Sequence, residues 1–207
     1  MRTCLIITGG DFSPLPEGVR YDYVIACDHG FDNAAKLKIK PDLLVGDFDS
    51  CKSDPADYEG IPVHSFPSHK DDSDTMLAIR YALSAGFKHQ IISCGLGGRL
   101  DHVLANIQSM AFVAKQGGIC EMTSASEHLQ TFTGGTISLP HFPGRSLSLF
   151  ALSNECKHVS ITGSVYDCED ITLRNTFPLG LSNAWKSDEV TIEMEEGIML
   201  IVCSAGK

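Results

Sequence analysis

The sequence predicts an α/β domain followed by a small antiparallel β-sandwich. Up to about residue 120, short apolar runs alternate with segments of helical periodicity, which is typical of a mostly parallel sheet covered by helices. From about Gln130 the helical periodicity disappears, and short alternating runs follow that are separated by Gly, Pro, Asn and Asp. We place the boundary after residue 126, which gives domains 1–126 and 127–207.

The first domain contains short apolar runs that we interpret as buried strands. They are Thr3–Ile7, Tyr23–Cys27, Leu43–Val45, Val63–Phe66, Gln90–Cys94 and Ile119–Met122. Helices are predicted between them, over Phe31–Leu37, Ser73–Ala85 and Asp101–Lys115. In the second helix Met76, Ile79 and Leu83 recur at helical spacing, and Gly86 supplies a stop.

The second domain is predicted to consist of strands alone. They are Thr136–Leu139, Leu147–Leu152, His158–Thr162, Ile171–Arg174, Val190–Met194 and Ile198–Cys203. We find no internal repeat and no low-complexity segment in the sequence.

The composition limits the classes of partner. The chain has 207 residues, of which 43% are hydrophobic and 20% charged, as in an ordinary globular protein that can bury a core. A formal net charge of −10 argues against a broad contact with a phosphate backbone, so we expect no nucleic-acid partner. No apolar run approaches the roughly 20 residues of a membrane span, and the N-terminus lacks a signal-peptide layout, so we expect no membrane partner.

The eight cysteines are scattered, and no two of them form a Cys-x-x-Cys pair. Cys4, Cys27, Cys94 and Cys203 lie inside apolar runs that resemble strands. We therefore expect buried thiols in a reducing cytoplasm, and neither disulfides nor a structural zinc site.

Aspartates accumulate where the predicted strands of the first domain end. They are Asp28, Asp47, Asp49, Asp71, Asp72, Asp74 and Asp101. Ligands of such folds bind at the carboxyl ends of the strands. Carboxylates in one cleft repel one another, and a cation relieves that repulsion. Because oxygen ligands without a His or Cys cluster suit Mg²⁺, the sequence points to metal-assisted chemistry on phosphates.

Two acidic segments each have a structural alternative. Asp47 and Asp49 are two residues apart, so on an extended backbone both side chains point to one side and can chelate a cation. The alternative is a solvated, Asp-rich turn. The segment from Lys70 to Asp74 opens a helix, and capping explains one or two of its residues. Capping explains three carboxylates and a lysine less well, and Lys70 is placed to hold a phosphate oxygen.

Glycine-rich turns follow two of the predicted strands. In Gly97-Gly98-Arg99 the backbone amides can form an anion site, and the Arg99 guanidinium can clamp a phosphate. The alternative is an ordinary loop in which Asp101 caps the next helix. Gly9-Gly10-Asp11 is either a second phosphate-facing turn or merely a tight turn. The chain has neither a P-loop motif nor a complete G-x-G-x-x-G fingerprint.

Four motifs in a fixed order carry a resemblance to a known family. They are Asp28-x-Gly30, Pro41-Asp42-x-x-x-Gly46-Asp47-Phe48-Asp49-Ser50, Lys70-Asp71-x-Ser73-Asp74 and Gly98-Arg99-x-Asp101-His102-x-x-x-Asn106. Together with the later Leu181-Ser182-Asn183, this set resembles the thiamine pyrophosphokinases over nearly the whole chain. Two positions depart from the family pattern, namely His29 in place of the usual Gly and Ser73 in place of the usual Thr.

The resemblance implies a homodimer with active sites at the subunit interface, and it implies a role for each matched residue. Asp47, Asp49 and Asp74 would hold Mg²⁺. ATP would contact Asp28, Gly30, Ser50, Lys70, Arg99 and Asp101. The catalytic set would be Lys70, Asp71, Asp74 and Arg99, with Asp71 or Asp74 taking a proton from the acceptor. Thiamine would contact Ser182 and Asn183, and Trp185 is either a cation–π partner of the thiazolium or a residue of the sandwich rim or core.

The implied reaction transfers the diphosphate of ATP to the hydroxyl of thiamine and yields thiamine diphosphate and AMP. The alternatives are a pyrophosphokinase acting on a hydroxymethyl-pterin, a non-catalytic regulator that binds a nucleotide or thiamine, and a metal-dependent phosphohydrolase. The match in the second domain favours thiamine. The acidic set favours catalysis, because a protein that only binds does not need so many mutually repelling carboxylates.

Overall fold

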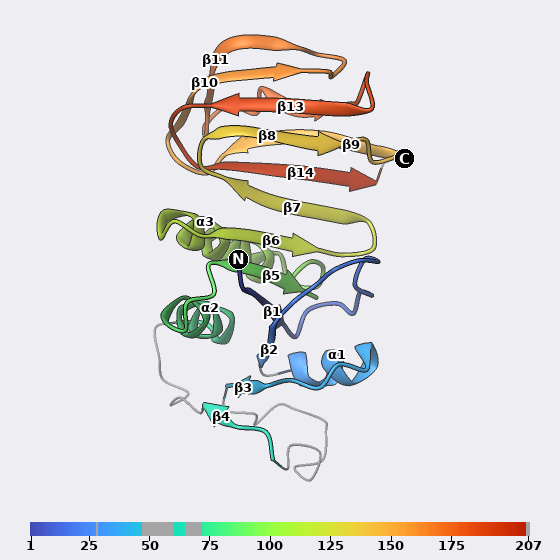
Figure 1. The fold of residues 1–207 in the computed structure, drawn as a ribbon, viewed down its shortest axis with the longest axis vertical. Coiled ribbons are helices and arrows are strands. Elements are labelled where there is room, and N and C mark those ends of the chain that lie inside the picture. Colours follow the sequence, from blue (N-terminus) through green and yellow to red (C-terminus); the bar gives the residue numbers. More distant parts are fainter. Residues whose placement is uncertain (28, 47–59, 65–71, 206–207) are drawn as a thin grey trace. The chain divides into compact units, whose positions relative to one another are not determined.

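The computed structural model describes residues 1–27, 29–46, 60–64 and 72–205. The chain divides into two compact units, Met1–Ala125 and Ser126–Lys207, whose elements are labelled in Figure 1. The predicted fold class is confirmed, because the first unit is a parallel α/β structure and the second is built from antiparallel strands.

The first unit is organised around a parallel sheet with the strand order β6-β5-β1-β2-β3-β4. Its strands are β1 (Thr3–Ile7), β2 (Tyr23–Cys27), β3 (Leu43–Val45), β4 (Val63–His64), β5 (His89–Ser93) and β6 (Ile119–Thr123). Every one of these neighbouring pairs is parallel. In this register Leu5 lies opposite Val24 on one side and Ile91 on the other. The carboxyl ends of the strands therefore meet at one edge of the sheet.

Helices cover the first sheet, and its central strand, β1, is buried. They are α1 (Gly30–Leu37), α2 (Asp74–Ser84) and α3 (Leu100–Lys115). All five residues of β1 are buried. Leu5 and Ile7 belong to the same core cluster as Phe31 and Ala34 of α1, while α2 and α3 pack against each other. Since both faces of β1 are covered, polar chemistry in this unit is confined to the loops at the strand ends.

The second unit contains two groups of antiparallel strands, with the orders β12-β9-β14-β7 and β11-β10-β13-β8. The first group comprises β7 (Glu127–Phe132), β9 (Arg145–Ala151), β12 (Gly180–Asn183) and β14 (Met199–Ala205). The second group comprises β8 (Gly135–Pro140), β10 (Glu155–Thr162), β11 (Cys168–Arg174) and β13 (Glu189–Met194). Leu147 and Ile201 of the first group share one core cluster with Val159 and Ile192 of the second. The two groups therefore pack face to face as a sandwich.

Two strands of the second unit do not appear among the predicted ones. The β7 strand, Glu127–Phe132, is mostly polar, and only Leu129 and Thr131 are buried in it. The β12 strand spans four residues, begins at Gly180, and contains Ser182 with a φ of 61°. Neither segment has the apolar alternation that marks a strand, and both are held by pairing with neighbouring strands.

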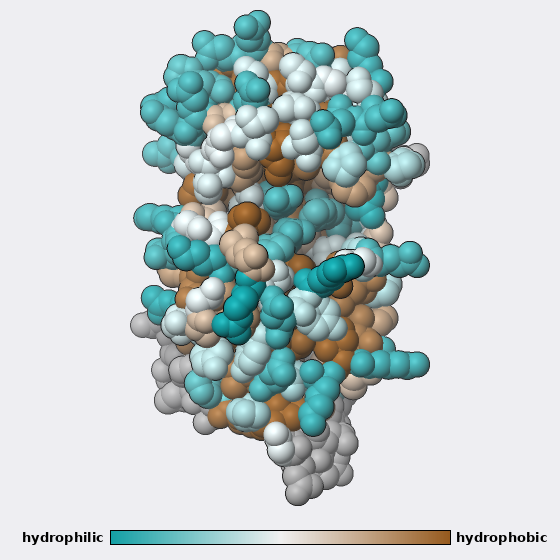
Figure 2. All heavy atoms as spheres, viewed as in Figure 1, coloured by the Kyte–Doolittle hydropathy of each residue, from teal (hydrophilic) through white to brown (hydrophobic). Residues whose placement is uncertain are grey.

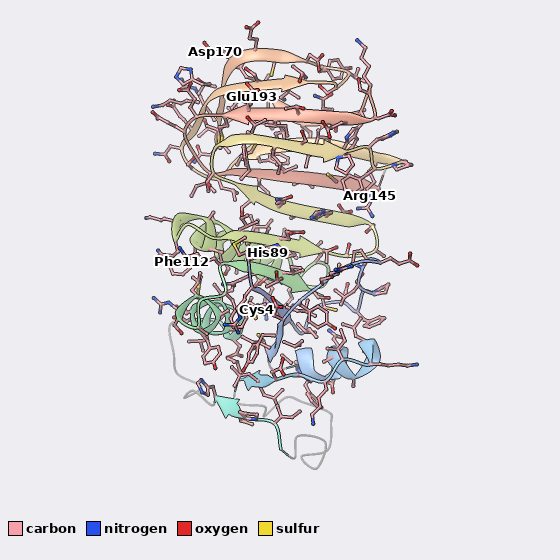
Figure 3. All side chains as sticks on the ribbon, viewed as in Figure 1. Cys4, His89, Phe112, Arg145, Asp170 and Glu193 are labelled. Carbon is pink, nitrogen blue, oxygen red and sulfur yellow. The ribbon has the colours of Figure 1, made fainter. Side chains whose placement is uncertain are left out.

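The described cysteines are all free, and each of them except Cys168 is buried. Burial raises the pKa of the Cys4 thiol to about 12 and that of the Cys203 thiol to about 11. Both thiols are therefore unreactive packing groups at neutral pH. Cys4 is labelled in the first unit in Figure 3.

None of the helices in the described ranges combines the length and the apolar character needed to cross a membrane.

Candidate active site

The start of α2 places Ser73 and Asp74. Ser73 is the N-cap, and its Oγ accepts a hydrogen bond from the Met76 backbone N–H at 3.2 Å. This confirms the capping predicted for this segment. Asp74 follows in the first turn, where the helix dipole favours a negative charge. Ser73 therefore supplies the cap, and the Asp74 carboxylate follows it in the first turn of α2.

The loop between β5 and α3 is shaped by two glycines and an aspartate. Gly97 and Gly98 have φ values of 81° and 66°, a region that favours glycine. The Asp11 carboxylate accepts the Gly98 N–H at 3.0 Å. A Cβ on Gly97 would lie 2.4 Å from that carboxylate, so only glycine fits there. Asp11, from the turn after β1, thus fixes the loop that carries Arg99.

The turn after β1 is held by Asn33, a residue that sequence reasoning missed. The Asn33 side-chain amide is buried on α1 and donates to the carbonyls of Thr8 and Gly10, at 2.9 and 3.0 Å. A Cβ on Gly10 would lie 2.3 Å from the Cys94 carbonyl oxygen, which again requires glycine. The sequence feature that could have revealed this role is a polar residue, Asn33, on the otherwise apolar face of the helix α1.

Asn106 of α3 plays the corresponding part on the opposite loop. Its side-chain amide is buried and donates to the Gly95 carbonyl at 2.9 Å. It therefore fixes the backbone just after β5. Asn106 is the last residue of the fourth motif, but the motif alone predicts no separate role for it.

The Arg99 guanidinium forms a forked pair with Asp101. Arg99 Nε lies 3.1 Å from Asp101 Oδ1, and Nη2 lies 2.5 Å from Oδ2. Their hydrogen bond is the main reason why the pKa of Arg99 is raised and that of Asp101 is lowered. Both side chains are largely exposed, at 73% and 63%, so water screens the pair. The alternative in which Asp101 caps α3 is wrong, because Arg99 is the N-cap residue.

A cavity of about 470 Å³ lies where these loops converge. Its lining comprises Thr8, Gly9, Gly10, Asp11, His29, Ser73, Asp74, Thr75, Gly95, Gly97, Gly98, Arg99, His102 and Asn106. The lining residues come from the loops at the carboxyl ends of β1, β2 and β5 and from the starts of α2 and α3. This is where a ligand is expected in a parallel α/β sheet, and backbone amides and Arg99 suit an anion.

The structure thus brings the predicted residues Asp74 and Arg99 to one cavity. Gly30 is not part of the cavity lining, and a Cβ there would lie 2.0 Å from the Ile7 carbonyl oxygen. Six other predicted site residues lie outside the described residues: Asp28, Asp47, Asp49, Ser50, Lys70 and Asp71. In the part of the chain that the structure describes, no three His, Cys, Asp or Glu side chains are grouped so as to hold a metal ion.

In the second unit, the Asn183 side chain is buried and its polar atoms are engaged. Its amide nitrogen donates to Ser164 Oγ and to the Tyr166 carbonyl, at 3.1 and 3.0 Å. Its oxygen accepts the N–H groups of Tyr166 and Ala184 at 3.1 and 2.8 Å. Asn183 therefore holds the loop around Tyr166 against β12. An apolar cavity of about 290 Å³ adjoins this loop and includes Tyr166, Leu181 and Asn183 in its lining.

Ser182 is exposed on β12, and its N–H donates to Ser148 Oγ at 3.0 Å. Trp185 is 9% exposed, belongs to the sandwich core, and donates its indole N–H to the Leu139 carbonyl at 3.3 Å. Its ring also stacks on His141, with 5.9 Å between the ring centroids. Of the three predicted thiamine contacts, Ser182 has the most accessible side chain.

Another cavity, in the second unit, has a larger volume of about 640 Å³ but offers less chemistry. Its charged groups are already paired, Lys157 with Glu196 at 2.9 Å and Arg174 with Glu155 at 3.1 Å. Hydrophilic residues gather over β10 and β11 in Figure 2. The volume of a cavity therefore does not identify the candidate active site. The site is identified by the glycine turns, Asp74 and Arg99, which converge on the cavity of the first unit.

These features define a class of protein. A parallel α/β unit with a ligand cavity at its strand ends is followed in the chain by an antiparallel β-sandwich. Two family models match in the same order: the thiamin pyrophosphokinase catalytic domain over residues 19–120, and the thiamin pyrophosphokinase vitamin B1 binding domain over residues 136–199. The chain belongs to the thiamin pyrophosphokinase family, which confirms the family predicted from the motifs.

Individual relatives agree with this assignment. A thiamine pyrophosphokinase of Bacillus subtilis is 27% identical over 214 residues, which cover 99% of each chain. The crystal structure of thiamine pyrophosphokinase from Bacillus subtilis matches with a TM-score of 0.88 at 23% identity over 100% of both chains. A thiamin pyrophosphokinase family protein from Enterococcus faecalis matches with a TM-score of 0.83 at 25% identity, again over 100% of both chains. The yeast enzyme shares the fold, with a TM-score of 0.76 at 12% identity over 98% of this chain and 86% of that one.

Proposed function

We propose that the chain transfers the diphosphate of ATP to the hydroxyl of thiamine and releases AMP. The observation that carries this proposal is the cavity in the family-matched first unit, where glycine turns, Arg99 and Asp74 converge. The match of the second unit to a vitamin B1 binding domain supports thiamine as the acceptor. On this proposal, residues 1–126 bind ATP and residues 127–207 bind thiamine.

We propose that Asp47, Asp49 and Asp74 hold Mg²⁺. The carboxylates of Asp74 and Asp11 at the cavity are hard oxygen donors, which fit this cation. When bound, Mg²⁺ neutralises negative charge on the phosphate oxygens. The test is a titration of Mg²⁺ in the transfer assay, with Ca²⁺ as the comparison ion.

The chain's own residues would position the phosphates and the acceptor. The Gly97 backbone N–H and the Arg99 guanidinium would donate to phosphate oxygens, while Asp101 orients that guanidinium and Asp11 holds the Gly98 N–H. Asp28, Gly30, Ser50 and Lys70 complete the ATP set, with Gly30 acting through its packing against β1. Either Asp71 or Asp74 accepts the proton of the thiamine hydroxyl as that oxygen attacks the β-phosphorus. Such a transfer depends mainly on positioning and charge stabilisation.

On the thiamine side we propose that Ser182 contacts the vitamin directly. Asn183 acts by holding the loop of Tyr166, since its amide is already engaged there. Trp185 supports the same region from the sandwich core. A Ser182→Ala variant should raise the KM for thiamine and leave the KM for ATP unchanged.

We also propose a homodimer with active sites at the subunit interface. Tyr166, Phe177, Leu179 and Leu181 are apolar or aromatic, lie near the predicted thiamine residues in the sequence, and are each more than half exposed. Three of them, Tyr166, Leu179 and Leu181, line one apolar cavity, and a second copy that covers this patch would stabilise it. Light scattering should give twice the chain mass of 22.4 kDa. A Leu181→Asp variant should shift the protein to the monomer and lower transfer, whereas an unchanged dimer would exclude this patch.

The decisive assay mixes the protein with ATP, Mg²⁺ and single vitamins, and detects AMP and diphosphate esters by mass. AMP and thiamine diphosphate in equal amounts, formed only with thiamine, support the proposal. A pterin diphosphate would identify the pterin pyrophosphokinase instead. AMP without any acceptor would indicate a phosphohydrolase, and ATP or thiamine binding without turnover would indicate a regulator. We propose a cytoplasmic location, because free thiols suit a reducing compartment.

A further inference from the structure

His29 precedes α1 and lines the cavity of the first unit. It is the N-cap residue by position, yet its side chain makes no capping hydrogen bond, and its backbone is right-handed helical. The side chain is 41% exposed. The imidazole therefore does not cap the start of α1, and it lines the cavity of the first unit.

The neighbouring Gly9 makes room for this side chain. A Cβ built on Gly9 would lie 2.6 Å from the His29 Cβ, closer than two such atoms approach in proteins. A residue larger than glycine at position 9 would thus displace His29 from the cavity wall. This close approach of Gly9 to His29 joins the turn after β1 to the start of α1, and both residues line the cavity together with Gly10.

The charges around the cavity indicate how an imidazole N–H could contact an anionic ligand. Among the described lining residues, Asp11 and Asp74 bring carboxylates, His29 and His102 bring imidazoles, and Arg99 shares its guanidinium with Asp101. The His29 Nδ1 lies 3.9 Å from the Asp32 carboxylate, which is beyond hydrogen-bond distance. An anionic ligand at the glycine turns would accept from such a donor with a charge-assisted hydrogen bond.

We propose that His29 contacts ATP in this protein, with its imidazole N–H donating to a phosphate oxygen, so that it sets nucleotide affinity. The identity of the ligand rests on the proposed function.

The test measures binding directly, by calorimetry with Mg²⁺ and a non-hydrolysable ATP analogue, and with inorganic tripolyphosphate. His29→Ala should weaken both ligands by about 10-fold or more, since it removes a hydrogen bond to a charged group. His29→Gln keeps an N–H donor and should recover most of that loss. His29→Gly also removes the imidazole, should behave like His29→Ala, and provides a second variant if one misfolds. His158→Ala, in the second unit, is the matched control and should bind normally.

Steady-state kinetics separate a contact from a merely structural effect. His29→Ala should raise the KM for ATP by a similar factor, with kcat and the KM for thiamine nearly unchanged. Unchanged binding in both His29→Ala and His29→Gly would overturn the proposal. Weaker binding of the ATP analogue with unchanged binding of tripolyphosphate would also overturn it, because the contact would then be to the nucleoside. If the wild type binds ATP through His29 but forms no thiamine diphosphate, the proposed function fails and this contact stands.

Discussion

The two units bury their strands in different ways, and this difference decides where each can hold polar chemistry. In the first unit β1 is buried at all five positions, and β5 is buried at its last four. In the second unit buried and solvent-facing residues alternate, as along β13. A parallel sheet covered on both faces leaves only its loops for a ligand, whereas an antiparallel sandwich leaves one face of each layer to water.

The charged groups follow this division. In the first unit Asp11, Asp74 and Arg99 converge from different loops on one cavity. In the second unit charged residues form pairs between neighbouring strands or their ends, such as Lys157 with Glu196 and His158 with Asp170. Figure 3 labels Asp170 on β11 and Glu193 on β13. We therefore expect charge changes in the first unit to alter activity, and those in the second unit to alter stability slightly.

The largest expected effect comes from Asp74→Asn. If Asp74 binds the cation that neutralises the phosphates, kcat/KM should fall by about 1000-fold or more, while the fold persists because Ser73 still caps α2. The measurement is thiamine-dependent AMP formation, with circular dichroism as the check on folding. Asp188→Asn, an exposed aspartate of the second unit, is the control. Equal activity of the two variants would remove Asp74 from the site.

Gly30→Ala should have the next largest effect, and it acts on packing. The added Cβ would lie 2.0 Å from the Ile7 carbonyl oxygen, so α1 must move away from β1. We expect a loss of about 3 kcal/mol or more in the free energy of unfolding, measured in urea. Gly144→Ala in the second unit has open space and a φ of 72°, so it should lose only about 1–2 kcal/mol. Equal losses would contradict the close approach at Gly30.

Arg99→Lys tests whether the forked guanidinium matters beyond its charge. Asp101 holds Arg99 through two hydrogen bonds, a geometry that a lysine ammonium cannot reproduce. On the proposed function the guanidinium contacts charge that develops on the phosphates, so we expect kcat to fall by about 10- to 1000-fold. Arg174→Lys changes a comparable ion pair in the second unit, with Glu155, and should leave the kinetics unchanged. A rise in the KM for ATP at constant kcat would limit Arg99 to ground-state binding.

The sequence predicts the fold well where local signals are strong. Continuous apolar runs located β1, β2 and β3 with the observed bounds, because a strand covered on both faces must be apolar throughout. The strands β7 and β12 were missed, since β7 is mostly polar and β12 is short, and each depends on its partner strands. Their formation is a tertiary effect that no local pattern records.

The site is predictable only in part, for a related reason. The motifs pointed to Asp74 and Arg99, because several carboxylates and a Gly-Gly-Arg turn follow the predicted strands. The residues that hold the loops of the site in place were not predicted. Asn33 and Asp11 form hydrogen bonds to backbone groups far along the chain, which no local pattern reveals. The ion pair between Arg99 and Asp101 was not predicted either, because the sequence pattern indicated a phosphate contact for Arg99 and a helix cap for Asp101.

The smallest expected effect is a pH dependence of stability that His158 confers on the second unit. His158 Nδ1 lies 2.7 Å from Asp170 Oδ1, and Glu195 lies 3.9 Å from its other ring nitrogen. The hydrogen bond to Asp170, followed by the charge of Glu195, raises the pKa of His158 above its ordinary value of 6.5. A raised pKa means that the folded protein holds the proton more tightly than the unfolded chain does.

The stabilisation by His158 is therefore complete below the ordinary pKa and is lost as the pH rises through the higher folded value. The difference in unfolding free energy between the wild type and His158→Gln should be larger at pH 5.5 than at pH 8.5, as urea titrations can measure. Asp170→Asn should reduce the same pH dependence, because it removes the main cause of the shift. Turnover should be unaffected by either substitution, since the pair lies on the open face of the sandwich and not at the cavity of the first unit. A difference that grows with pH would contradict this assignment, because it would require a carboxylate and not the imidazole to be the titrating group.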